Sequence, residues 1–352
     1  MMLAAPTTSG ASFSSDACLN RSLFQFGAIN ARLRTDAPDF EARFKRIFHD
    51  CLRNGQSASA TAPPDADLVV QSASASLPVR VEIPGWDSSD AEETLGSLFP
   101  ELDLVPTGSG LPGNWRCFAQ ASRVSFPVVS VCGTTMLVDR SLPWQWLVAH
   151  CFLDHVMRIQ KDYCFFHAAT VAVGKKGVFI GGAKGAGKST LSLALAGRGH
   201  GFLGDEVAQL HGTTGTMLPF RRAVSIRTGP QASAVREFIS RNQFDSETLL
   251  DGTQRLRLPV SWIFPESGSY PAQLTHAFFL SEKEPQCRAS QFDFSLRDLK
   301  LIEPLRATIA GSTGPQLMLR FLGLFGGASC FRLAPGGSPD ETAQTIETLV
   351  SK

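Results

Sequence analysis

A glycine-rich turn between an apolar run and a helix-forming run limits what this chain can fold into more than any other stretch. The turn is Gly182–Ser189 (GAKGAGKS), which fits the phosphate-loop pattern G-x-x-x-x-G-K-[ST]. Residues 177–180 (GVFI) before it predict a short buried strand, and residues 190–196 (TLSLALA) after it predict a helix that ends at Gly197. The sequence therefore predicts strand, loop and helix in the order that a phosphate-binding loop requires.

The residue types in the turn suit the binding of nucleotide phosphates. Glycine lets the backbone approach an anion closely and adopt angles that a side chain forbids. N–H groups at the start of the helix then point at phosphate oxygens, while Lys188 is expected to contact the β- and γ-phosphates and Ser189 to bind Mg²⁺. We expect ATP and Mg²⁺ as ligands, held by Gly182, Ala183, Lys184, Gly185, Ala186, Gly187, Lys188, Ser189 and Thr190. The alternative is a glycine-rich turn that binds nothing.

Composition and charge narrow the classes of partner. The 33 basic and 32 acidic residues leave a formal net charge of +1, which gives no general attraction to nucleic acid or to an anionic membrane. No uncharged apolar stretch reaches about 18 residues, so we expect no membrane span. The N-terminus lacks the basic and apolar regions of a secretion signal, and the eight cysteines form no C-x-x-C pair. A cytoplasmic protein with free thiols is the simplest interpretation.

The length of 352 residues is typical of two domains. We expect a disordered lead-in over residues 1–20, an N-terminal α+β region over residues 21–140, and a nucleotide-binding domain over residues 141–352. Within the last of these, residues 296–309 and 315–325 are expected to form helices. The predicted fold class is α/β, with the phosphate loop in the C-terminal domain.

Two further features flank the loop. Asp205 and Glu206 follow the apolar run of residues 201–204 (GFLG), at the end of a predicted strand where a metal ligand or a general base would lie beside the phosphates. The alternative is an exposed acidic turn. His167 stands directly before another apolar run, residues 168–173, and by itself it would be read as an ordinary core or edge histidine. Neither feature defines a reaction alone.

Taken together, these features resemble a known family. Residues 163–230 resemble the catalytic domain of HPr kinase/phosphorylase, and more closely the broader set of HPr-kinase-like proteins. That family carries a histidine, a strand, a phosphate loop, a helix ending in Arg-Gly-His and a paired acidic motif. In this chain those elements are His167, Gly182–Ser189, Arg198-Gly199-His200 and Asp205-Glu206, with glutamate where the family usually has a second aspartate. The resemblance implies an HPr-kinase-like α/β domain.

The resemblance also implies roles for individual residues. Asp205 would be the base that acts on the acceptor hydroxyl, His167 would lie near that carboxylate and the phosphate, and Glu206 would join Ser189 in binding the metal. The family's acceptor HPr and its reverse phosphorolysis are not carried over to this chain. The glycine-rich segment linked to phosphorolysis is not found downstream, and the N-terminal part does not match.

Two functions from different classes follow. The first is a kinase that moves the γ-phosphoryl of ATP to a hydroxyl, with serine favoured, on a peptide, a protein or a small molecule. Arg221, Arg222 and Arg227 could then hold an anionic acceptor or the transferring group, or they could form a solvated strand face. The second is a nucleotide-dependent binding or scaffold protein of a biosynthetic system with little phosphotransfer. We expect no nucleic-acid or membrane partner, and homo-oligomerisation is left open.

Overall fold

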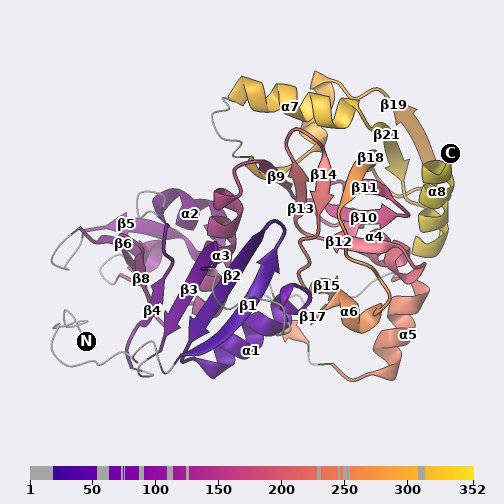
Figure 1. Cartoon of the computed structure of the whole chain (residues 1–352). Helices are drawn as coiled ribbons and strands as arrows, with labels where there is room; N and C mark the ends of the chain where they lie inside the picture. The colour runs from indigo at the N-terminus through magenta and orange to yellow at the C-terminus, as the bar shows by residue number, and fades with distance from the viewer. Residues whose placement is uncertain are drawn as a thin grey trace. The chain divides into compact units, whose positions relative to one another are not determined.

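The computed structural model describes residues 19–53, 63–72, 74, 76–86, 91–108, 114–123, 127–227, 231–244, 246–248, 252, 254–307 and 314–352. The expected lead-in over residues 1–20 lies outside these ranges except for its last two positions. The structure is mixed α/β, as expected from the sequence, with several sheets and helices (Figure 1).

The contacts divide the chain into two compact units. Among the described residues, the first comprises those up to Gln25 together with those in Ile29–Lys45 and Leu52–Ile159, and the second comprises those in Phe26–Ala28, Arg46–Cys51 and Gln160–Lys352. Two short early segments therefore belong to the second unit.

Helix α3 (Trp144–Ile159) falls in the first unit, whereas the sequence grouped residues 141–159 with the nucleotide-binding domain. Its partners explain this difference, because Trp144 stacks on Phe40 and Trp146 meets Phe99 edge to face, and both partners belong to the first unit. The proline before α3 marks the start of a helix and not a domain boundary.

An eight-stranded sheet, counted over the described residues, forms the first unit. Its strands in spatial order are β1 (Asn20–Phe26), β2 (Ile29–Thr35), β3 (Ala66–Gln71), β4 (Val79–Glu82), β8 (Thr135–Val138), β7 (Val129–Cys132), β6 (Arg116–Gln120) and β5 (Leu104–Thr107). The helices are α1 (Pro38–Ile47), α2 (Ala91–Leu98) and α3, with 3-10 turns η4 (Pro100–Leu102) and η5 (Ala121–Arg123).

A ten-stranded sheet, again counted over the described residues, forms the centre of the second unit. The main path runs β12 (Gly201–Gly204), β10 (Ala169–Val173), β11 (Lys176–Gly181), β18 (Ala272–Leu280), β14 (Thr216–Leu218), β13 (Ala208–His211), β9 (Tyr163–Phe166) and β20 (Pro304–Ala307). Strand β21 (Ser329–Ala334) pairs with β18 and with β19 (Arg288–Phe292).

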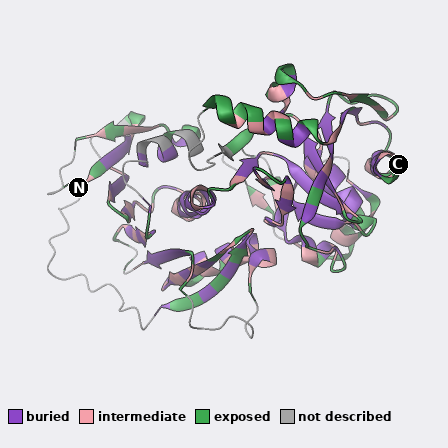
Figure 2. Ribbon diagram, turned by 45° about the horizontal axis from the view of Figure 1, so that its top comes forward, coloured by how far each residue is buried: buried purple, intermediate pink, exposed green. Residues whose placement is uncertain are grey.

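Helices of the second unit pack on both faces of this sheet. The described helices and 3-10 turns of this unit are η2 (His49–Cys51), α4 (Lys188–Gly197), α5 (Ser233–Arg241), α6 (Val260–Ile263), η6 (Leu296–Leu301), α7 (Gly314–Gly326) and α8 (Pro339–Ser351). Alternate residues of β11 point to opposite faces: Val178 and Ile180 pack in one cluster with α4, α5 and α8, whereas Phe179 packs in another with α7. Figure 2 shows the strands between these layers largely buried.

A smaller three-stranded antiparallel sheet lies in the same unit. Within the described residues its order is β15 (Val224–Arg227), β17 (Gln254–Leu258) and β16 (Glu247–Thr248). Val224, Ile226 and Leu258 join the cluster under α4, so one face of this sheet is apolar and buried. The opposite face carries polar side chains.

The prediction of a helix over residues 296–309 is wrong. The chain forms the 3-10 turn η6 and then the strand β20, which pairs with β9. The cause is Pro304, which disfavours helical angles at Glu303 and removes a helical N–H. The expected helix over residues 315–325 is confirmed as α7.

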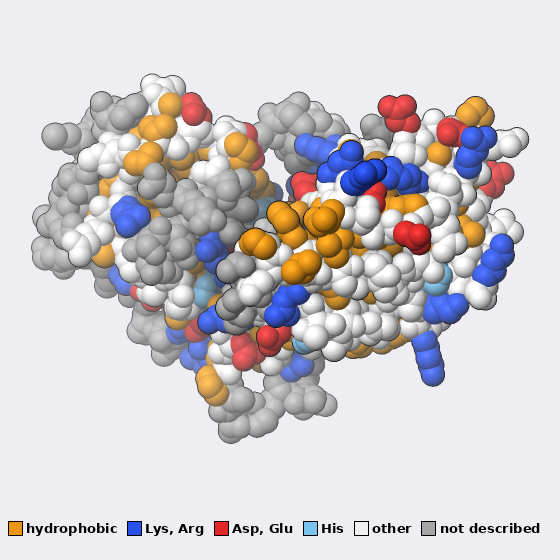
Figure 3. Space-filling view, turned by 90° about the horizontal axis from the view of Figure 1, so that it is seen from above, with side chains coloured by type: hydrophobic (Ala, Val, Ile, Leu, Met, Phe, Trp, Pro, Cys, Tyr) orange, Lys and Arg blue, Asp and Glu red, His pale blue; other side chains and the backbone are white. Residues whose placement is uncertain are grey.

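Helix α7 carries exposed apolar side chains. Met318 and Leu319 are 53% and 66% exposed, and they belong to the helix at the top of Figure 1, on the side where Figure 3 shows hydrophobic side chains gathered. Over the described residues, no helix has the length and apolar character needed to cross a membrane.

Candidate functional site

The phosphate loop connects β11 to α4, as predicted. Gly182, Gly185 and Gly187 have φ values of +149°, +85° and +104°, in a region of backbone angles that favours glycine. A Cβ on Gly182 would also lie 3.0 Å from the Cβ of Leu280. The glycines at these three positions therefore give the loop its shape, and residues with side chains would strain it.

Lys188 folds back over the loop. Its Nζ donates hydrogen bonds to the carbonyl oxygens of Gly182 at 2.7 Å and Ala183 at 3.2 Å. Burial lowers the pKa of Lys188, while the carboxylates of Glu303, Asp205 and Glu206 oppose that shift. The lysine is thus placed between the loop and a group of acidic side chains.

Strand directions explain how these acidic side chains reach the loop. Strand β10 is antiparallel to both β11 and β12, so β11 and β12 run in the same direction and end at the edge where β10 begins. His167 lies just before β10, the phosphate loop follows β11, and Asp205 follows β12. Segments that are 15 or more residues apart in the sequence therefore meet at one edge of the sheet.

Asp205 is a buried carboxyl group at this edge. It is only 4% exposed, and neither of its oxygens accepts a hydrogen bond of normal geometry from any described residue. Burial and then the charge of Glu206 raise the pKa of Asp205 to about 7, against the opposing effects of Ser189, Lys188 and Arg222. The Ser189 hydroxyl is thus close enough to influence the carboxyl group without forming a regular hydrogen bond to it.

Glu206 and His167 lie at the same edge of the sheet as Asp205, and this edge is called the acidic edge below. Glu206 forms an ion pair with Arg222, with Oε2 and Nη1 3.2 Å apart. The backbone N–H of His167 donates to the carbonyl oxygen of Glu303 at 2.8 Å. Burial, and then Lys188, lower the pKa of His167 below its usual value near 6.5, so the imidazole is neutral at pH 7. His167, Asp205 and Glu206 therefore come together around Lys188.

Glu303 was missed by sequence reasoning. It acts on the pKa of both Lys188 and His167, yet it lies in the segment that was expected to be helical. Pro304, next to it, was the available signal, because a residue before proline favours an extended chain. The extended chain of β20 pairs with β9 and so brings Glu303 to His167.

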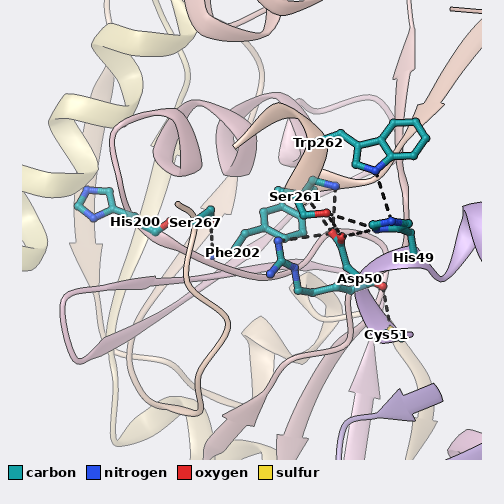
Figure 4. Close-up of polar contacts among 10 residues, drawn as sticks. His49, Asp50, Cys51, His200, Phe202, Ser261, Trp262 and Ser267 are labelled. Atoms are coloured by element: carbon teal, nitrogen blue, oxygen red, sulfur yellow. Dashed lines mark hydrogen bonds and ion pairs between the residues drawn. The ribbon is translucent and has the colours of Figure 1, made fainter. Parts of the chain in front are cut away.

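The three candidate acceptor-binding arginines have different surroundings. Arg222 meets Glu206 in the site, and Arg227 is exposed at the end of β15. Arg221 instead points to Asp50, with Nη2 and Oδ2 3.4 Å apart. Asp50 also accepts the backbone N–H groups of Val260 at 3.0 Å and Ser261 at 3.2 Å (Figure 4). Arg221 thus belongs to a structural anchor and not to the acidic edge.

The residues present are suited to Mg²⁺ only together with phosphate. Among the described residues, no group of three or more His, Cys, Asp or Glu side chains could hold a metal ion. Mg²⁺ commonly binds one or two protein ligands together with substrate phosphates and waters. Ser189 at the end of the loop and Glu206 after β12 fit that smaller role, and the carboxyl group of Asp205, which lacks a regular hydrogen bond, lies next to Glu206 in the chain.

The Arg-Gly-His end of α4 has a structural explanation. Glu347 of α8 accepts hydrogen bonds from Arg198, with Oε1–Nε and Oε2–Nη2 distances of 2.8 and 2.6 Å, and its Oε1 lies 2.6 Å from His200 Nε2. Both basic side chains thus connect α8, through Glu347, to the C-terminal end of α4, the helix that follows the phosphate loop.

We expect Glu347→Gln to lower the free energy of unfolding by about 0.5–1 kcal/mol, because the network is only half-buried. The hydrogen bond from Arg198 lowers the pKa of Glu347 below its usual value of 4.5. The stabilisation should therefore be complete above pH 4.5 and be lost as the pH falls through the folded pKa. Thermal melts at pH 7 and pH 3.5 test this, with Glu237→Gln in the exposed pair with Arg241 as the control. Equal melts at pH 7 would contradict the role.

Gly204, the residue before Asp205, has no room for a side chain. A Cβ there would lie 2.6 Å from the carbonyl oxygen of Val207 and 3.0 Å from that of Phe220, and both are backbone atoms. We expect Gly204→Ala to destabilise the protein by roughly 1–3 kcal/mol and to displace Asp205. Thermal melting and nucleotide titration measure both effects. Gly108→Ala, where nothing lies within 4 Å, is the control, and a Gly204→Ala protein that melts like the wild type would refute the prediction.

Comparison with known proteins gives little beyond this geometry. No family model matches the chain, and no curated protein matches it. Among solved structures, the chain is similar to the Hpr(Ser) kinase/phosphatase from Coxiella burnetii, at 17% identity and a TM-score of 0.26, over 53% of this chain and 88% of that one. A likeness at this level establishes neither the family nor the activity of this protein.

Proposed function

We propose that this protein is an ATP- and Mg²⁺-dependent kinase that transfers the γ-phosphoryl group to a hydroxyl, with serine favoured, of a peptide, protein or small molecule. The observation that supports this most is that the phosphate loop and the buried carboxyl group of Asp205, which has no regular hydrogen-bond partner among the described residues, lie at the same edge of the sheet. Lys188 and Asp205 interact electrostatically there, and Asp205 has a pKa of about 7. Phosphoryl transfer needs a positioned cation and a nearby proton acceptor.

Each residue then has a distinct task. The loop from Gly182 to Thr190 binds the phosphates through backbone N–H groups, and Lys188 stabilises their charge. Asp205 accepts the proton of the attacking hydroxyl, and neutral His167 orients the carboxyl group or the phosphate. Bound Mg²⁺, held by Ser189 and Glu206, would neutralise charge on the phosphate oxygens.

A nucleotide-dependent binding or scaffold protein with little phosphotransfer is the competing function. The decisive experiment incubates the protein with γ-labelled ATP, Mg²⁺ and candidate acceptors, and separates labelled acceptor from free phosphate. Labelled acceptor supports the kinase. Tight MgATP binding without labelled acceptor across peptides, proteins and small hydroxyl compounds favours the scaffold. Absence of MgATP binding would overturn both.

A further inference from the structure

The polar face of the small sheet carries an unusual concentration of arginine. Arg257 of β17 lies opposite Ser225 of β15, and Arg255 lies between Arg227 of β15 and Glu247 of β16. Directly paired residues point to the same side of a sheet, and so do residues two positions apart on one strand. Arg255 and Arg257 therefore project from the same polar face. Together with Arg222 they are called the arginine cluster below.

Two carboxylates pair with the arginine cluster. Glu247 lies 3.4 Å from Nε of Arg255 and 3.5 Å from Nε of Arg257, and it also accepts a hydrogen bond from Arg46 at 2.9 Å. Arg222 pairs with Glu206. The three guanidinium groups of the arginine cluster thus share Glu206 and Glu247, and Asp205 also acts on the pKa of Arg222.

The guanidinium groups of the arginine cluster are largely removed from water. The side chains of Arg222, Arg255 and Arg257 are only 11%, 11% and 5% exposed. The Nε atoms of Arg222 and Arg255 are buried and make no hydrogen bond of normal geometry with a described residue. Burial, followed by the charge of Arg257, lowers the pKa of Arg255 to about 10. Buried polar atoms without hydrogen-bond partners are unfavourable, so a purely structural network would be expected to satisfy them.

The arginine cluster is directly linked to the acidic edge. Arg222 binds Glu206 directly, and Glu206 also acts on the pKa of Arg255. The cluster is therefore next to the carboxyl groups that would meet an acceptor hydroxyl. It lies on a different sheet from the phosphate loop, whose own lysine is available for ATP.

We propose that the arginine cluster binds an anionic group of the acceptor, a carboxylate or a phosphate close to the hydroxyl that receives the phosphoryl group. Planar guanidinium groups bind such anions through paired, charge-assisted hydrogen bonds. The proposal rests on the kinase function proposed above and narrows its acceptor to acidic molecules or acidic segments.

The test titrates inorganic phosphate, and in a second arm succinate, into the full-length protein saturated with Mg²⁺ and β,γ-imido-ATP. The analogue fills the γ-phosphate position, so added anion must bind elsewhere. Calorimetry should show anion binding that weakens about tenfold or more in Arg255→Gln, and that strengthens in Glu247→Gln because a competing carboxylate is removed. Arg241→Gln, on the exposed surface of α5, is the control and should match the wild type. The stronger of the two arms identifies the acceptor's anionic group.

The outcomes separate this proposal from the kinase function. Failure of the wild-type protein to bind β,γ-imido-ATP would contradict the proposed kinase function itself. Normal nucleotide binding with equal anion affinity in the wild type, Arg255→Gln and Glu247→Gln would overturn only the acceptor site. Anion binding that occurs with ADP but disappears with β,γ-imido-ATP would show that the arginine cluster binds the transferring phosphoryl group. That result would also overturn the proposed acceptor site. Because Glu247→Gln predicts a gain of affinity, poor folding of Arg255→Gln alone does not decide the test.

Discussion

Asp205→Asn should bind MgATP within about an order of magnitude of the wild type and transfer phosphate about 10²-fold more slowly or worse. Asparagine keeps the shape of the side chain but cannot take the proton of the attacking hydroxyl. Nucleotide titration measures the affinity for MgATP. Single-turnover transfer to an acceptor, identified beforehand with labelled ATP, measures the rate. His167→Ala should lose less, because His167 is assigned a supporting role.

The control for this substitution is Asp162→Asn, because Asp162 is an exposed aspartate directly before β9. If Asp205→Asn loses nucleotide binding in proportion to its rate, Asp205 is a metal ligand and Glu206 becomes the first candidate for the base. If the variant loses neither, the kinase function is contradicted.

The raised pKa of Asp205 adds two pH-dependent results. The value of kcat/KM should rise as the pH increases through about 7, where the carboxyl group becomes the base. The folded-state pKa near 7 exceeds the usual 3.8, so the folded state holds the extra proton and stability falls as the pH rises between those values. Without nucleotide, Asp205→Asn should therefore melt at a higher temperature than the wild type above pH 7. Identical melting curves there would show that the buried charge is compensated.

Lys188→Ala should reduce MgATP-dependent transfer by roughly 10²–10³-fold, because a preorganised cation beside the phosphates is lost. The lysine is only 7% exposed, although a solvent- or ligand-facing side chain was expected from the sequence, and its ammonium binds carbonyl oxygens of its own loop. Lys188→Met, which keeps most of the volume, should show the same loss with less effect on folding. The assays are labelled-ATP transfer and thermal melting.

Lys175→Ala is the matched control, since Lys175 is exposed in the turn at the other end of β11. It should leave transfer and nucleotide affinity within about twofold of the wild type, as expected for a surface substitution. Full transfer by folded Lys188→Met would remove the phosphate loop from the mechanism.

The local parts of the site were predictable because their signals are local. Glycine spacing and the flanking apolar runs gave β11, the loop and α4 within two residues of their observed bounds. Strand β12 could be placed before Asp205 for the same reason. Helical spacing failed after Ser295, where the pattern continues through a proline that the backbone cannot accommodate in a helix.

The arginine cluster was not predictable from the same kind of signal. Arg255 and Glu247 face each other only through the pairing of β16 with β17, and Arg46 comes from a segment about two hundred residues earlier. The sequence marked Arg221 and Arg222 equally, yet neighbouring residues on an extended chain point in opposite directions. One therefore binds Asp50 and the other binds Glu206.

The early segment that carries Asp50 has a consequence for how the second unit can be made. Asp50 caps the start of α6 across a separation of 210 residues, and Phe26 and Phe48 meet edge to face within the same unit. A fragment cut at residue 160 would lack these side chains and would leave the N–H groups of Val260 and Ser261 without their acceptor. During synthesis the unit can be completed only after most of the chain has left the ribosome, since such distant contacts close last. A shortened version for study should therefore keep residues 26–51 attached, or supply them as a separate peptide.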